Sequence, residues 1–165
     1  MPIDYAGLAK KYQPKHVKTL IIGETPPPNG TSFFYLPKMR SKEYRLPSVV
    51  FRHYFGKLPF SADEYKLMLD KLTKNNIFVM FICDTPLRIS NRIFSKGYDP
   101  EELTKLISHI PLLREKISSR GIDIPAEKII FLPARNYCDR HIRKFFPNSQ
   151  IISWEDFRTT HELLP

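Results

Sequence analysis

Several features that would place a protein in a common class are scarce or missing in this chain. It has only two cysteines, Cys83 and Cys138, which lie far apart and form neither a metal-binding motif nor a disulfide framework. No apolar run approaches the roughly 20 residues that cross a bilayer, and residues 1–18 lack the apolar centre of a signal peptide. We therefore expect a cytoplasmic protein with buried thiols and no membrane contact.

The glycine motifs of common nucleotide-binding folds and hydrolases are absent as well. The chain has six glycines, and none belongs to a Gly-x-Gly-x-x-Gly, a Gly-Lys-Ser/Thr or a Gly-x-Ser-x-Gly pattern. These absences argue against a dinucleotide-binding site, a P-loop and an α/β-hydrolase. The sequence indicates neither a metal ion nor another cofactor.

What the chain does have is an excess of positive charge and enough apolar residues for a core. It carries 26 Lys and Arg against 17 Asp and Glu, a net charge of +9, and 42% of its residues are apolar. Its 165 residues contain no repeats or linkers, so residues 1–165 are expected to form one domain. The charge favours a polyanionic partner. Nothing indicates the oligomeric state, and a monomer is assumed.

Much of the positive charge lies between residues 38 and 57, interleaved with aromatic residues. Cations contact phosphates, and rings stack on bases or pack in a core. The candidate phosphate-binding residues are Arg40, Lys42, Arg45 and Arg52 here, and Arg135 further along the chain. The alternative is an amphipathic helix with a solvated basic face, whose Phe51 and Tyr54 point inward.

Four short apolar runs alternate with helical patterns. The expected strands are 17–23, 77–83, 128–132 and 150–153. Helices are expected after the capping residues Ser61 and Asp99, over 137–146 and over 154–163. This order predicts right-handed parallel crossovers. The expected fold is a three-layer α/β/α sandwich around a mainly parallel four-stranded sheet, with the first strand central.

Three of these strand ends carry the residues best suited to chemistry: Gly23-Glu24-Thr25-Pro26, Cys83-Asp84-Thr85-Pro86 and Pro133-Ala134-Arg135-Asn136. Because the carboxyl ends of parallel strands share one edge, Glu24 and Asp84 are expected near Arg135 and Asn136. Asp84 and Asn136 are the candidate residues for binding the edge of a base. One carboxylate can orient a water or stabilise a cation while the other accepts hydrogen bonds from a ligand. Alternatively, Asp84 caps a turn and pairs with Arg88.

Behind Glu24, a stiff proline loop leads to three aromatic residues, Phe33, Phe34 and Tyr35. A carboxylate at a strand end with flat rings close behind it indicates a pocket for a planar group. The alternative is a proline-rich turn with a solvated Glu24 and with the rings in the core.

Gly23-Glu24-Thr25-Pro26, followed about ten residues later by Phe33 or Phe34, resembles the first motif of the uracil-DNA glycosylase superfamily. The resemblance is specific over residues 20–35. It implies the same four-stranded fold, a nucleic-acid partner such as DNA, and hydrolysis of the N-glycosidic bond of a damaged or modified base. It also implies that Glu24 positions or activates the attacking water or stabilises the sugar cation, and that Phe33 or Phe34 stacks on the flipped base. Tyr35 would then limit the pocket.

The chain departs from the family's pattern at two places. Asp84 stands nearest to the family's base-reading asparagine, and an ionised Asp only accepts hydrogen bonds, which suits a base with an amino group. No His-Pro-Ser occurs, and Ser153-Trp154-Glu155 follows the fourth strand instead, with Trp154 as the one large candidate for a wedge. Three hypotheses follow: a divergent glycosylase, an inactive nucleic-acid-binding module of the same fold, or a small-molecule or nucleotide hydrolase.

Overall fold

A computed structural model describes residues 3–27, 33–37, 45–87 and 99–165 of the chain. At its centre is a sheet of four strands, β1 (Thr19–Gly23), β2 (Ile77–Phe81), β3 (Ile129–Phe131) and β4 (Gln150–Ile151). Their order across the sheet is β2-β1-β3-β4, and every neighbouring pair is parallel. The expected parallel sheet is therefore confirmed, with β1 between β2 and β3.

The strands are shorter than the apolar runs that predicted them, but regular pairing continues beyond their ends. The amide of Ile82 donates to the carbonyl of Gly23, and the amide of Leu132 donates to that of Ile22, both at 2.9 Å. The apolar runs that contain β2 and β3 therefore stay hydrogen-bonded to β1 for one residue beyond the end of each strand. All five residues of β2 are buried, as parallel strands covered on both faces require.

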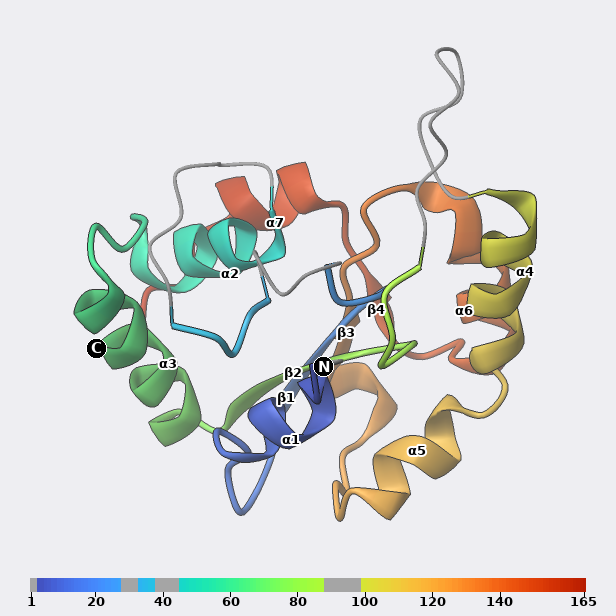
Figure 1. Cartoon of the computed structure of the whole chain (residues 1–165), viewed down its shortest axis with the longest axis horizontal. Helices are drawn as coiled ribbons and strands as arrows, with labels where there is room; N and C mark the ends of the chain where they lie inside the picture. Colours follow the sequence, from blue (N-terminus) through green and yellow to red (C-terminus); the bar gives the residue numbers. More distant parts are fainter. Residues whose placement is uncertain (1–2, 28–32, 38–44, 88–98) are drawn as a thin grey trace.

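The helices follow the strands in the expected order. They are α1 (Tyr5–Lys10), α2 (Leu46–Phe55), α3 (Ala62–Lys74), α4 (Pro100–His109), α5 (Leu113–Ser119), α6 (Asp139–Phe145) and α7 (Trp154–Thr159), with 3-10 turns η2 (Ala126–Lys128) and η3 (Asn136–Cys138). Figure 1 shows α2, α3 and α7 on one side of the sheet and α4, α5 and α6 on the other. The fold is a three-layer α/β/α sandwich.

Side-chain caps mark the starts of α1, α3 and α7, whereas Asp99 precedes α4 without a cap hydrogen bond from its side chain. Ser61 Oγ accepts a hydrogen bond from the amide of Glu64 at 3.1 Å and starts α3. The expected helix over 137–146 divides into η3 and α6. The last helix ends at Thr159 because the chain then leaves it to bind α2: the amides of Glu162 and Leu164 donate to carbonyls of that helix, both at 2.9 Å.

The helix α2 buries the apolar side of the basic segment. Val50, Phe51 and Tyr54 are at most 3% exposed, as the amphipathic alternative predicted. The ring of His53 stacks on Phe157 of α7, with the ring centres 3.7 Å apart. In the part of the chain that the structure describes, no helix is long and apolar enough to cross a membrane.

Candidate functional site

Topology singles out the carboxyl end of β1. The connection after β1 runs to β2 on one side, whereas the connection after β3 runs to β4 on the other side, so the switch point lies between β1 and β3. In open parallel sheets, ligands bind outside the carboxyl ends of the strands at such a switch point. Glu24 is the first residue after β1 and therefore stands at this position.

Close packing explains why a glycine precedes Glu24. A Cβ atom built on Gly23 would lie 2.9 Å from Leu46 Cδ2 and 3.1 Å from the ring of Phe81. Any larger residue would push α2 or β2 away from the end of β1. Gly23 thus lets Glu24 follow directly on a strand that is tightly covered.

The loop after Glu24 is held in place from two directions. Thr25 Oγ1 donates to the carbonyl of Thr85 at 2.9 Å and accepts from the amide of Leu87 at 3.2 Å, which joins the loops after β1 and β2. The hydroxyl of Tyr5, on α1, donates to the carbonyl of Pro27 at 2.6 Å. The described part of this loop is therefore fixed by tertiary contacts as well as by its prolines.

Glu24 itself is buried, so the alternative of a solvated carboxylate is wrong. Glu24 is 6% exposed, and its Oε1 accepts a hydrogen bond from the amide of Ala134 at 2.8 Å. The other oxygen, Oε2, is buried without a hydrogen-bond partner among the described residues. A buried acceptor of this kind is costly unless something else binds to it.

The protonation of Glu24 follows from this environment. Burial raises the pKa of its carboxyl to about 7, since the charged form loses its hydration. The hydrogen bond from Ala134 lowers this pKa, the charge of Asp139 raises it, and the charge of Arg135 lowers it. At neutral pH, both the acid and the carboxylate form of Glu24 are therefore populated.

Asp84 occupies a different environment at the end of β2. Its Oδ2 lies 2.7 Å from Arg120 Nη2 and 3.0 Å from Lys116 Nζ, and both cations come from the segment of α5 and its cap. Lys116 Nζ also donates to the carbonyls of Phe81 at 2.7 Å and Ile82 at 3.0 Å. Asp84 is therefore paired with two cations, and its base-binding role stays a prediction. Arg88, the partner that the alternative named, lies outside the described residues.

The aromatic residues behind the loop belong to the core. Phe33, Phe34 and Tyr35 are at most 2% exposed. Phe34 stacks on Phe51 of α2, and the hydroxyl of Tyr35 accepts from the amide of Val79 in β2 at 2.8 Å. This corrects the expectation that these rings stack on a ligand, since neighbouring side chains and backbone cover them. The alternative that placed them in the core is confirmed.

The segment between β3 and α6 forms the exposed side of the site. Ala134, Arg135, Asn136 and Tyr137 are all exposed, directly beside the amide that binds Glu24. Asn136 starts η3 at the edge of the sheet where the sequence placed it. Trp154 is partly buried, and its Nε1 donates to the carbonyl of Leu132 at 2.8 Å. The base-binding role of Asn136 and the wedge role of Trp154 stay predictions.

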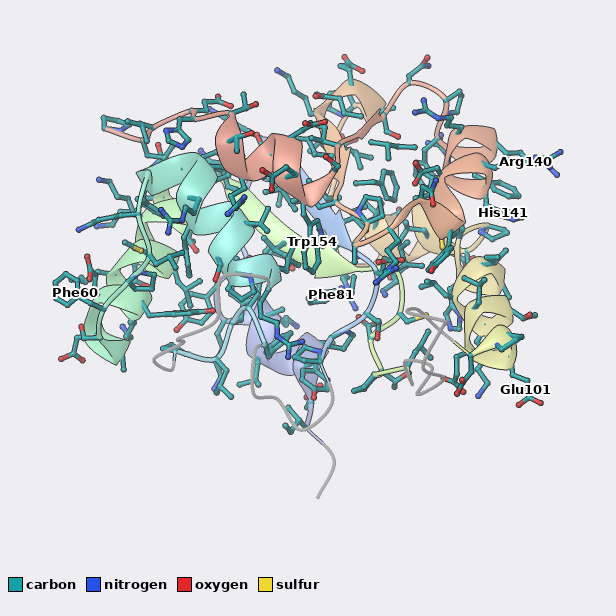
Figure 2. The ribbon with its side chains drawn as sticks, turned by 90° about the horizontal axis from the view of Figure 1, so that it is seen from above. Phe60, Phe81, Glu101, Arg140, His141 and Trp154 are labelled. Carbon is teal, nitrogen blue, oxygen red and sulfur yellow. The ribbon has the colours of Figure 1, made fainter. Side chains whose placement is uncertain are left out.

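The three candidate phosphate-binding residues that the structure describes lie on different parts of the chain. Arg45 is exposed immediately before α2, Arg52 is partly buried within α2, and Arg135 is exposed beside Glu24. Arg40 and Lys42 lie outside the described residues. Further exposed cations, which the sequence did not single out, lie on α6: Arg140, Arg143 and Lys144. Figure 2 shows the side chain of Arg140 extending outward from this helix.

The two cysteines flank Glu24 in the topology, because Cys83 follows β2 and Cys138 ends η3. Both are buried, as expected. Burial raises the pKa of Cys83 to about 11 and that of Cys138 to about 12, and the charges of Glu24 and Asp139 add to the effect on Cys138. Neither thiol is therefore an ionised nucleophile at neutral pH.

Asp139, the first residue of α6, is the carboxylate that sequence reasoning missed. Its charge acts on Glu24, and its Oδ1 is also buried without a partner among the residues described. The only sequence signal was an acid shortly after the third strand end. Over the described ranges, no group of three or more His, Cys, Asp and Glu side chains could hold a metal ion.

In comparisons with known proteins, the chain matched no family model, no curated protein and no solved structure. The geometry of the site and the sequence motifs therefore carry the functional argument.

Proposed function

We propose that this chain is a divergent member of the uracil-DNA glycosylase superfamily that hydrolyses the N-glycosidic bond of a base in nucleic acid. One observation carries the proposal: Glu24 is buried at the switch point of the sheet and its Oε2 has no partner among the described residues. Such hydrolysis needs a carboxylate, sheltered from bulk water, beside the cation that develops on the sugar.

In the proposed reaction, the oxygen of a water forms a bond to the anomeric carbon of the sugar. The bond between this carbon and the base nitrogen breaks, and its electron pair leaves with the base. Glu24 Oε2 accepts the proton of the attacking water, and the departing base takes a proton from solvent. The amide of Ala134 holds Oε1 at 2.8 Å and so orients the carboxyl plane. A pKa of about 7 suits this proton transfer at neutral pH.

Charge supports a polymer over a free nucleoside as the substrate. The net charge is +9, and Arg135 beside Glu24 is followed on α6 by the exposed Arg140, Arg143 and Lys144. Cations spread along a surface in this way suit a chain of phosphates. The short Gly-Glu-x-Pro motif supports the same substrate class, and the identity of the base is left to experiment.

A second candidate is a nucleic-acid-binding module of the same fold without chemistry. The segment after β4 favours it, because this segment has structural tasks in place of a His-Pro-Ser loop. Ser153 Oγ accepts from the amide of Asp156 at 3.1 Å and caps α7, while Trp154 binds the carbonyl of Leu132. In this candidate, the cationic surface would bind phosphates and Glu24 would transfer no proton.

The test is incubation of the protein with single- and double-stranded oligonucleotides that carry uracil, hypoxanthine, mismatched thymine or modified cytosines. We expect abasic sites to form with one of these bases. Glu24→Gln should abolish this, whereas Glu101→Gln, an exposed position on α4, should not. Figure 2 shows Glu101 at the outer surface, which makes it a matched control.

The result also separates the two candidates. No cleavage with any base, together with retention of the oligonucleotide that weakens steeply with salt, would reject the hydrolase and support the binding module. Neither cleavage nor retention would reject both.

A further inference from the structure

The outward side of α6, with the turn before it, joins an exposed ring to three exposed cations. Three residues at a spacing of four, Cys138, Ile142 and Phe146, are at most 1% exposed and pack this segment against the core. The opposite side faces solvent. Its exposed residues between positions 137 and 145, named here the α6 strip, are Tyr137, Arg140, Arg143 and Lys144.

The α6 strip carries positive charge that no neighbouring acid neutralises. The one acid between residues 134 and 149 is Asp139, and it is partly buried. In the part of the chain that the structure describes, no ion pair involves Arg140, Arg143 or Lys144. Cations that gather on one helix face without acidic partners suit a polyanion and do little for the stability of the fold.

Tyr137 supplies a ring at the same place. It is 39% exposed, and within the described ranges the other exposed Phe, Tyr or Trp is Phe60. Figure 2 shows Phe60 on one side of the molecule and α6, marked by Arg140, on the other. Since the three rings behind the loop after β1 are buried, Tyr137 is the ring that a ligand on the α6 side can meet.

Chain geometry ties the α6 strip to Glu24. The amide of Ala134 donates to Glu24 Oε1 at 2.8 Å, and Tyr137 follows Ala134 by three residues. The Cα atoms of Ala134 and Tyr137 are therefore at most about 11 Å apart. From Tyr137 to Lys144 the strip is about 10 Å long, roughly the length of three stacked nucleotides. A nucleic-acid strand that passes Glu24 can thus continue along α6.

We propose that the α6 strip binds a single strand of nucleic acid, in which a base stacks on Tyr137 and the phosphates contact Arg140, Arg143 and Lys144. Stacking on an aromatic side chain needs a base whose face is open, and an unpaired strand offers such faces, whereas a duplex keeps its bases stacked on each other. The strip therefore selects an unpaired strand over a duplex. That this strand also carries the base released at Glu24 rests on the proposed function.

The test measures binding of the full chain to labelled oligonucleotides of equal length. They are an oligothymidylate, a strand of abasic tetrahydrofuran residues with the same phosphates, and a duplex. Fluorescence anisotropy at several salt concentrations gives the affinity and its salt dependence. At physiological salt we expect the wild type to bind the oligothymidylate most tightly, because this strand alone offers both phosphates and open base faces.

The ring is tested by its removal. Tyr137→Ala should weaken binding of the oligothymidylate by about 5- to 150-fold, the usual effect of losing one base stack, and should leave binding of the abasic strand unchanged. Tyr137→Phe keeps the ring and should bind both strands like the wild type. Phe60→Ala also removes an exposed ring, so it is the matched control and should change neither affinity.

The cations are tested by a triple variant, Arg140→Gln with Arg143→Gln and Lys144→Gln. It should weaken binding of both single strands and reduce the slope of log affinity against log salt by about 2, since each phosphate contact on a single strand contributes about 0.7. The matched control removes the same charge at the opposite edge of the sheet, where the exposed residues before β1 and β3 are Lys15, Lys18 and Lys128. Their replacement with Gln should change the slope much less.

Several results would overturn the proposal. Equal wild-type affinity for the oligothymidylate and the abasic strand would exclude the base stack without any variant, and equal effects of Tyr137→Ala and Phe60→Ala would do the same. Equal slopes in the two triple variants would show that the phosphates do not contact α6. Tighter binding of the duplex would reject the unpaired strand. Binding to phosphatidylserine vesicles but to none of the oligonucleotides would assign the strip to a membrane surface.

These measurements do not depend on turnover. Binding through the α6 strip without cleavage of any base would keep the strip and reject the hydrolase. Cleavage that is lost in Glu24→Gln but unaffected by the Tyr137 and triple variants would do the opposite.

Discussion

The ends of β1 and β2 carry the same sequence pattern, an acid followed by threonine and proline, but the fold gives the two acids opposite environments. Asp84 has a side chain that is 37% exposed and binds two cations, Lys116 and Arg120. Glu24 is 6% exposed and its Oε2 has no partner among the described residues. An acid that the fold neutralises serves stability, whereas an acid that the fold isolates is available for chemistry.

The strongest test of this comparison removes one charge at each strand end. On the oligonucleotide that the cleavage experiment identifies, Glu24→Gln should lower kcat/KM by about 100- to 10,000-fold, since it removes the proton acceptor. Asp84→Asn should lower it by less than about tenfold, because the carboxylate of Asp84 is already engaged by Lys116 and Arg120. Abasic sites formed per unit time measure both effects. Equal losses in the two variants would contradict the division of roles.

The second test uses the dependence of stability on pH. The pKa of Glu24 rises from 4.5 to about 7 on folding, so between these values the native state binds more protons than the unfolded state. The free energy of unfolding therefore falls as pH rises through this window. The glutamine side chain in Glu24→Gln cannot ionise, so this variant should lack this decrease in the free energy of unfolding with rising pH. Relative to the wild type, this variant should gain about 2–3 kcal/mol between about pH 5 and about pH 8.

Urea unfolding of the wild type and of Glu24→Gln at both pH values measures this gain. Any effect of the amide on packing is the same at both pH values and therefore cancels. Asp84→Asn is the control, because it also removes one acid from the same edge of the sheet. A wild type and a Glu24→Gln variant whose stabilities change in parallel with pH would show that Glu24 ionises as freely as in the unfolded chain.

Sequence patterns were sufficient to predict the parallel sheet and the place of Glu24 at the carboxyl end of its first strand. Buried β-branched runs and proline-bounded strand ends depend on local residues, and the carboxyl ends of parallel strands share one edge whatever the loops do. The fate of Asp84 was not predictable in this way, because Lys116 and Arg120 reach it from α5, more than thirty residues later in the chain. Local pattern contains no information on which helix crosses which strand end.

The burial of the aromatic rings and the place of Asp139 beside the site were not predictable from the sequence, for related reasons. A Phe at a loop end looks the same in sequence whether it faces a ligand or Phe51, and only packing against α2 decides. Asp139 was indistinguishable from an ordinary acid in a first helical turn. Its unpartnered Oδ1 becomes visible only when the segment after β3 is folded back beside Glu24.

The third and smallest effect concerns the ion pairs of Asp84. Lys116→Met should lower the free energy of unfolding by about 1–2 kcal/mol, because it leaves Asp84 with one cation and two carbonyls without their donor. The partial exposure of Asp84 lets water replace some of the loss. Lys116→Arg should recover part of it. Unfolding by urea at neutral pH measures the stability of these variants. An unchanged free energy of unfolding in Lys116→Met would show that solvent fully substitutes for the ammonium group.

Lys116 has one more consequence, for how copies of this protein behave toward each other. In the sheet that the described residues form, β2 is an edge strand, and the carbonyl of its last residue, Phe81, accepts from Lys116 Nζ. Part of this edge is already covered, because the hydroxyl of Tyr35 accepts from the amide of Val79. A bare strand edge is a template on which a strand of another chain can add. A strand that docked there would have to displace or bury an ammonium group. The same lysine that neutralises Asp84 thereby opposes edge-to-edge aggregation.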